Sequence, residues 1–222
     1  MSDSIKPSAA FITLEGSEGV GKTSNLNVIE AFLRKRGVDL LVTREPGGTA
    51  LGERIRGVLL EVGADSDEPA MVPMAELLLM FAARAQHVEQ VIRPALAAGQ
   101  WVLSDRFTDA SFAYQGGGRG LPNSDIEVLQ TLVQGELRPH KTLYLDLDPA
   151  QAFERIADRA HDRIEREALD FFHRVRNNYL QRAQAEPDRF IVIDAGQNIE
   201  AVANDVTVAL EKIMQDSMDA GR

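Results

Sequence analysis

The chain has 222 residues, 44% of them hydrophobic, and a formal net charge of −10. This length suits a single domain with a substantial core across residues 1–222, and the negative charge, without a dense run of Lys or Arg, argues against nucleic-acid binding. The chain has no cysteine, which excludes disulfides and thiolate metal sites, and no apolar run is long enough to span a membrane. We therefore expect a soluble cytoplasmic protein with neither nucleic acid nor a membrane as a partner.

An apolar strand pattern at residues 11–15 runs directly into the turn GSEGVGKT, which matches the phosphate-binding pattern GxxxxGK[ST]. Glycines let backbone amides surround a phosphate, Lys22 can reach the β and γ oxygens, and Thr23 offers a hydroxyl to Mg²⁺. A turn without a ligand is the weaker interpretation, because a strand precedes it and an amphipathic helix follows. We expect a nucleoside triphosphate to contact Gly16, Ser17, Glu18, Gly19, Val20, Gly21, Lys22 and Thr23.

Strand and helix patterns alternate along the rest of the chain. A strand, a helix and a second strand at this spacing form a βαβ unit, which predicts a parallel sheet with helices on both faces. The strand patterns lie at residues 11–15, 38–43, 101–104, 142–147 and 190–194. The helical patterns lie at 24–36, 51–60, 75–98, 126–137, 149–159, from about 167 to 185, and at 199–214. The predicted fold is α/β, a P-loop NTPase with a five-stranded parallel sheet flanked by helices.

Polar residues follow two of these strands, at the edge of the sheet where α/β proteins bind ligands. The segment TREPGGT at residues 43–49 follows the second strand, and Asp105-Arg106 follows the third. A carboxylate there can face Mg²⁺ directly or through water, and a guanidinium can hold a second anion. An isolated Asp-Arg pair is more often a surface salt bridge, but its position beside the P-loop strand favours a site.

A P-loop indicates a nucleotide but not a reaction, since switches, motors and small-molecule kinases all contain it. Four segments in order make this chain resemble the bacterial thymidylate kinase family: the P-loop, TREPGGT at 43–49, DRF at 105–107 and AYQGGGRGL at 113–121. The resemblance implies a fold like that of nucleoside-monophosphate kinases and transfer of the γ-phosphoryl group of ATP to dTMP. It further implies Mg²⁺ as cofactor and a homodimer.

The resemblance also assigns residues to the acceptor phosphate. It implies that Arg106 holds the phosphate of dTMP, that Glu45 lies near that phosphate and the metal, and that both are catalytic residues. Arg56 could reach the same phosphate, although arginines on helix surfaces are usually only solvated. Because a phosphate monoester has a second pKa of about 6, its oxygen is already a nucleophile and no catalytic base is needed. The work left to the protein is alignment and charge neutralisation, by Lys22 among others.

For the base, the resemblance implies that an aromatic residue stacks on thymine and that Arg84 contacts its O4. Similar proteins place the aromatic four residues before this arginine, where the chain has Met80, whereas Phe81 lies three before it. We assign the stacking to Phe81, with Met80 packing on the base, or core packing of both, as alternatives.

The glycine-rich segment supplies the remaining contacts that the resemblance implies. Ser111 and Gln115 would bond the thymine edge, and their spacing of four residues places them on one face of a helix. Tyr114 would crowd a ribose 2′ position, with a buried structural tyrosine as the alternative.

The P-loop has no arginine at its variable positions, and family members of this kind bring arginines from a closing lid. The lid is expected at about residues 155–167, with Arg155, Arg159 and Arg163 as candidates and the last two as the expected catalytic pair. The lid is several residues shorter than usual, and an ordinary charged helix surface is the alternative. Two other functions stay open: another nucleoside-monophosphate or small-metabolite kinase of this fold, and a P-loop module that binds nucleotide without catalysis.

Overall fold

The computed structural model describes residues 9–61, 70–157 and 162–219. The described residues form one five-stranded sheet in the order β2-β3-β1-β4-β5, and every neighbouring pair is parallel. The strands are β1 (Phe11–Glu15), β2 (Leu40–Arg44), β3 (Trp101–Asp105), β4 (Lys141–Asp146) and β5 (Phe190–Asp194). The predicted α/β fold class and the five parallel strands are confirmed.

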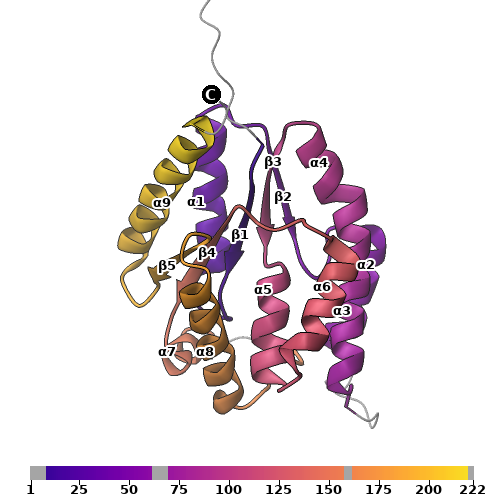
Figure 1. Ribbon diagram of the computed structural model, residues 1–222. Helices are drawn as coiled ribbons and strands as arrows, with labels where there is room; N and C mark the ends of the chain where they lie inside the picture. Colours follow the sequence, from indigo (N-terminus) through magenta and orange to yellow (C-terminus); the bar gives the residue numbers. More distant parts are fainter. Residues whose placement is uncertain (1–8, 62–69, 158–161, 220–222) are drawn as a thin grey trace, which may run out of the picture.

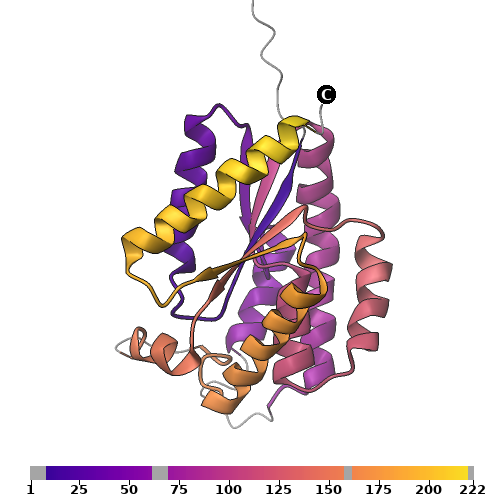
Figure 2. The same cartoon turned by 60° about the vertical axis from the view of Figure 1, so that its left-hand side comes forward.

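Helices connect the strands and cover both faces of the sheet, as Figures 1 and 2 show. The helices are α1 (Lys22–Lys35), α2 (Ala50–Glu61), α3 (Pro73–His87), α4 (Arg93–Ala97), α5 (Thr108–Ser111), α6 (Asn123–Gln134), α7 (Pro149–Glu154), α8 (Leu169–Ala185) and α9 (Ile199–Asp219), with π-helical segments η1 (Val88–Ile92) and η2 (Phe112–Gly118). The predicted helix at 75–98 is continued through Pro94, because this proline lies in the first turn of α4, where its missing N–H costs no hydrogen bond. None of the described helices is long and apolar enough to cross a membrane.

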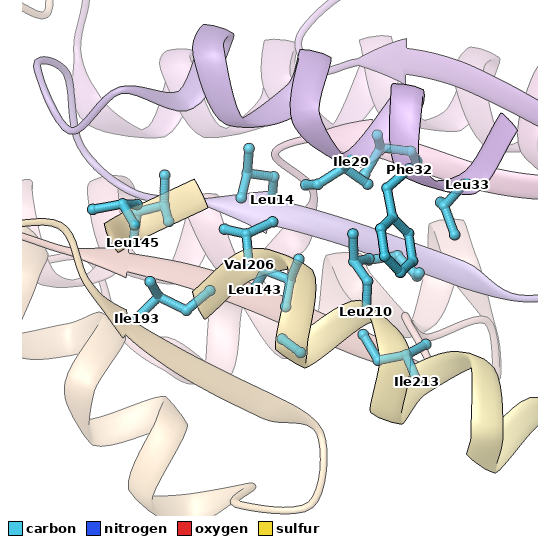
Figure 3. Close-up of a cluster of buried hydrophobic side chains, with 14 of the residues drawn as sticks. Leu14, Ile29, Phe32, Leu33, Leu143, Leu145, Ile193, Val206, Leu210 and Ile213 are labelled. Carbon is cyan, nitrogen blue, oxygen red and sulfur yellow. The ribbon is translucent and has the colours of Figure 1, made fainter. Parts of the chain in front are cut away.

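The two faces of β1 have different neighbours, because successive side chains of a strand point to opposite sides. Ile12 and Leu14 belong to a large apolar cluster between the sheet and the helices α1 and α9. Figure 3 shows Leu14 in this cluster with side chains from both helices. On the opposite face Phe11 packs among apolar side chains of η1, α4 and β3, but Thr13 and Glu15 are polar and fully buried. That second face therefore leads toward a polar site.

The register of the sheet brings the ends of three strands together. Asp105 at the end of β3 lies opposite Leu14 of β1 and Arg44 of β2. The arrowheads of β1 and β3 in Figure 1 point toward the end of the sheet where α5, α7 and α8 lie. The residues that follow these strands are consequently held close to one another by backbone hydrogen bonds.

Candidate active site

The turn between β1 and α1 has the backbone that a phosphate-binding loop requires. Gly16, Gly19 and Gly21 all have positive φ angles, of 146°, 78° and 89°, which residues with a Cβ rarely adopt. A Cβ on Gly19 would lie 2.2 Å from the backbone oxygen of Ala152 in α7. Only glycine therefore lets the loop pass this close to α7 while its amides face inward.

Lys22 begins α1 and folds back across this loop. Its Nζ donates to the backbone oxygens of Gly16, at 2.9 Å, and Ser17, at 2.7 Å. Burial and the nearby positive charge of Arg106 lower the pKa of Lys22 to about 8. An ammonium held at the mouth of an amide-lined loop is arranged to meet the terminal oxygens of a triphosphate.

Thr23 and Asp105 line one cavity between the loop and β2. Oδ1 of Asp105 is buried and has no hydrogen-bond partner in the described parts of the chain. Those same parts contain no cluster of three or more His, Cys, Asp and Glu side chains that could hold a metal. Mg²⁺ does not need one, because it is commonly bound by one or two protein oxygens together with water and substrate phosphates. A free carboxylate oxygen beside a threonine fits this ion.

A second cavity lies on the other side of the loop and gathers most of the predicted acceptor residues. Its wall includes residues from the phosphate loop, the loop after β2, the connection after β3, the helices α2, α3, α5 and η2, and the segment after residue 161. The lining consists of Glu18, Glu45, Pro46, Arg56, Leu60, Met80, Arg84, Arg106, Phe107, Ala110, Ser111, Tyr114, Gln115, Asp162 and Ile164. Of the predicted substrate-binding residues, all of which the structure describes, Phe81 alone is missing from this wall.

Arg106 is held in the cavity by its backbone. It has a φ of 67°, which is unfavourable for a side chain of this size. Hydrogen bonds fix both sides of it: its N–H donates to the oxygen of Leu14, and its own oxygen accepts from Ser104 Oγ at 2.7 Å. The next N–H, of Phe107, donates to Glu15 Oε1 at 2.7 Å. Strain that is held in place by so many contacts is typical of functional sites.

Of the two terminal nitrogens of the Arg106 guanidinium, one donates a hydrogen bond and the other has no partner in the described structure. Nη2 donates to Glu18 Oε1 at 2.5 Å, and Nη1 is buried without a hydrogen-bond partner among the residues described. Arg56, on α2, also lines this cavity, and its Nη1 donates to the oxygen of Pro46 at 3.1 Å. Two guanidinium groups on one wall favour an anionic ligand.

Glu18 joins the two sites, a role that the sequence pattern did not reveal. It belongs to the phosphate loop, yet it lines the second cavity, and its Oε2 accepts from Tyr114 O–H at 2.8 Å. Burial alone would raise the pKa of Glu18, but the charges of Arg106 and Lys22 outweigh it, so the pKa is lowered overall. The carboxylate therefore remains charged between the two positive groups.

Glu45 lines the cavity, and its carboxylate contacts Arg84 and His87. Its Oε2 accepts from Arg84 Nε at 2.7 Å, and its Oε1 is 2.9 Å from His87 Nδ1. His87 in turn is 2.7 Å from Thr43 Oγ1, and Arg84 Nη1 donates to Ser111 Oγ at 3.1 Å. Because both oxygens of Glu45 are engaged, this arrangement fits a positioning group and not the expected catalytic contact. No sequence pattern indicated that His87 contacts Glu45.

Phe81 and Met80 are placed as the alternative assignment has them, with Met80 and not Phe81 at the cavity. Phe81 is 2% exposed and packs with Leu77, Phe112 and Ile126 in a core cluster, whereas Met80 is on the cavity wall. The assignment of base stacking to Phe81 does not fit this placement. Met80 and Phe81 are consecutive residues of α3, so their side chains point in directions about 100° apart around the helix axis.

The expected lid arginines lie in different places. Arg159 is outside the described residues. Arg163 turns toward α3, where its Nη2 donates to Glu76 Oε2 at 2.6 Å and its Nε to the oxygen of Leu59 at 2.8 Å. This corrects the expectation that Arg163 faces the phosphates, because its guanidinium is engaged away from the P-loop. Arg155 does face that region and lines a third cavity with Gly19, Gly21 and the start of α9.

Comparison with known proteins finds relatives over nearly the whole chain. The family model described as thymidylate kinase matches residues 14–206. A thymidylate kinase of Teredinibacter turnerae is 53% identical over 205 residues, 92% of this chain and 98% of the relative. One of Pseudomonas putida is 53% identical over 209 residues, 94% of this chain and 98% of the relative. The crystal structure of thymidylate kinase from Ehrlichia chaffeensis matches with a TM-score of 0.72 and 32% identity, over 94% of this chain and 99% of that one.

Proposed function

The chain belongs to the thymidylate kinase family, and we propose that its two principal sites hold the two nucleotides of that family's reaction. The activity is transfer of the γ-phosphoryl group of ATP to dTMP, which gives dTDP and ADP. ATP lies with its phosphates in the loop formed by residues 16–23 and its nucleoside part toward the third cavity. The acceptor dTMP lies in the second cavity, with its phosphate toward Arg106.

The observation that carries this assignment is the position of Arg106 relative to the phosphate loop. Its Nη2 contacts Glu18 of the loop, its Nη1 is unpaired within the described structure, and Arg106 lines the acceptor cavity. One guanidinium thus holds the acceptor phosphate next to the place where Lys22 meets the donor phosphates. Arg56 adds a second positive charge for the acceptor.

The protein residues act by alignment and charge, because the acceptor oxygen is already ionised. Lys22 and the loop amides neutralise the donor phosphates, and Arg106 sets the direction of the attacking oxygen. Thr23 and Asp105 would hold Mg²⁺, which supplies charge neutralisation on the transferring phosphoryl group when bound. Tyr114, held by Glu18, lies where it would crowd a 2′-hydroxyl and so favour a deoxyribose.

The base is read by side chains from α3, α5 and η2. Met80 packs on the thymine ring in place of Phe81. Arg84 and Ser111 form one bonded pair on the wall and face O4, and Gln115 offers an Oε1 that has no partner among the described residues. Each of these polar groups lines the cavity, which supports recognition of the base edge.

The lid of this single P-loop kinase domain includes the described residues 155–157 and 162–167. Arg155 supplies positive charge near the triphosphate, and Arg163 fastens the lid to α3 through Glu76. A homodimer is supported by exposed apolar side chains on α2, α3 and α6, and α3 packs against both of the other helices. These side chains are Leu51, Val58, Met74, Leu78, Val128 and Leu132. The lack of cysteine fits the reducing environment of a cytoplasmic location.

An acceptor panel tests this function directly. With ATP and Mg²⁺ we expect dTMP to be phosphorylated far faster than dCMP, GMP or AMP. Equal turnover of the four acceptors would favour a less specific monophosphate kinase. Slow ATP hydrolysis without a phosphorylated acceptor would favour a module that only binds nucleotide.

A further inference from the structure

A buried carboxylate outside the cavity wall contacts the residue that reads the base. Glu76 on α3 is 1% exposed, and its Oε1 accepts from Gln115 Nε2 at 2.8 Å. Arg119 donates to the same carboxylate from Nε and Nη2, at 3.3 and 3.1 Å, and Arg163 donates from Nη2 at 2.6 Å. No part of the proposed reaction uses Glu76.

The bond to Glu76 determines which way the Gln115 amide faces. A carboxylate only accepts hydrogen bonds, so the amide must present its NH₂ group to Glu76 and its oxygen to the other side. That oxygen is buried and has no partner within the described structure, although Gln115 lines the acceptor cavity. An unsatisfied buried acceptor of this kind favours a ligand with an N–H at that position.

We propose that Glu76 is a positioning residue that sets base specificity by holding Gln115 Oε1 toward the acceptor cavity. This inference rests on the proposed dTMP site. Thymine has an N–H at N3 and can donate to that oxygen, whereas cytosine has a lone pair at N3. In the observed orientation Gln115 satisfies thymine and opposes cytosine, and the reverse would hold if the amide turned over.

The surroundings of Glu76 keep it an acceptor. Burial alone would raise the pKa of Glu76, but the hydrogen bond from Gln115 and the interactions with Arg119 and Arg163 lower it overall. A carboxylate that stays ionised cannot donate to Gln115, so the amide keeps one orientation at neutral pH.

Glu76→Gln is the direct test, because the new side chain has nearly the same shape but can offer either NH₂ or oxygen to Gln115. We expect kcat/KM for dTMP to fall and that for dCMP to rise or hold, so that their ratio drops by about tenfold or more. The KM for ATP should change by less than about threefold. Arg84 contributes its own discrimination at O4, so some preference for dTMP should remain.

Glu167→Gln is the matched control. Glu167 accepts from Arg119 and does not contact Gln115, so its substitution also removes a carboxylate partner of Arg119. We expect it to leave the dTMP to dCMP ratio unchanged, whatever it does to the rate. In a Gln115→Ala background, Glu76→Gln should have no further effect on the ratio.

Equal loss of activity on dTMP and dCMP in Glu76→Gln would overturn the proposal and leave Glu76 a structural role. If that variant does not fold, the wild-type enzyme with N3-methyl-dTMP decides, because this acceptor has no N3–H to donate. Turnover equal to that of dTMP would also overturn the proposal, and a loss of about a hundredfold would support it. Failure of the proposed function would appear separately, as wild-type protein that does not phosphorylate dTMP.

Discussion

Replacing Arg106 by alanine tests the central contact of the site. The side chain is 14% exposed and pairs with Glu18, which is 18% exposed. The substitution removes the donor to the acceptor phosphate, and it also leaves the Glu18 carboxylate without its strongest partner beside that phosphate. Both effects weaken the binding of an anion in the acceptor cavity and leave the phosphate loop intact.

The expected size follows from the hydrogen bonds that Arg106 can donate to the phosphate. A hydrogen bond to a charged group contributes about 1.5 to 3 kcal/mol, and Nη1, which has no partner in the described structure, provides at least one such bond. Repulsion from the freed Glu18 adds to this loss, so we take about 3 kcal/mol in all. Since each 1.36 kcal/mol is tenfold, kcat/KM for dTMP should fall by on the order of 10²-fold.

Steady-state kinetics with each substrate varied in turn provide the measurement. The KM for ATP should change by less than about threefold. Arg34→Ala is a suitable control, because Arg34 is half exposed and pairs with Glu30 on the surface of α1, a contact worth roughly 0–1 kcal/mol. If affinity for ATP fell as much as affinity for dTMP, the assignment of Arg106 to the acceptor would be wrong.

Three further predictions concern charge, metal and packing. Lys22 is protonated below its pKa of about 8, so kcat/KM for ATP should decline as pH rises through that value. Lys22→Arg should remove this decline. A Lys22→Arg variant with the same pH profile as the wild type would contradict the role of this ammonium. Asp105→Ala should raise the Mg²⁺ concentration needed for half-maximal activity by about tenfold, and a magnesium titration of activity that matches wild type would exclude it as a ligand. Phe81→Ala should cost about 3 to 5 kcal/mol of stability in denaturant unfolding. Met80→Ala should instead raise the KM for dTMP several-fold with little loss of stability. If Phe81→Ala raised this KM and Met80→Ala lowered the stability, Phe81 would be the residue that packs on the base.

The fold could be predicted because its determinants are local. Apolar runs and helical periodicity depend on neighbours within a few residues, and the five strands lie within a few residues of their predicted bounds. One difference is the helix predicted at 149–159, since α7 ends at Glu154. The end of a helix depends on what it packs against, and α7 packs closely on the phosphate loop at Gly19.

The site could be predicted only where one motif carried the chemistry. Gly16 to Thr23 and Asp105-Arg106 each combine residue type with position after a strand, so their joint placement follows from the parallel sheet. The pair Glu45 and His87 gave no such pattern, because these residues are 42 positions apart and meet only through packing of α3 on the loop after β2.

By itself, the sequence determined the order of strands and helices along the chain, the phosphate loop, and the carboxyl-end edge of the sheet at which the candidate site lies. Tertiary structure alone decided that Met80 and not Phe81 lines the acceptor cavity, that Arg163 binds Glu76, and that Glu76 orients Gln115. The physical reason is the distance along the chain between the residues that interact. Backbone conformation and periodicity are set by nearby residues, whereas the direction of a side chain at the site depends on partners such as Glu76 and Gln115, 39 residues apart, which only the packed helices bring into contact.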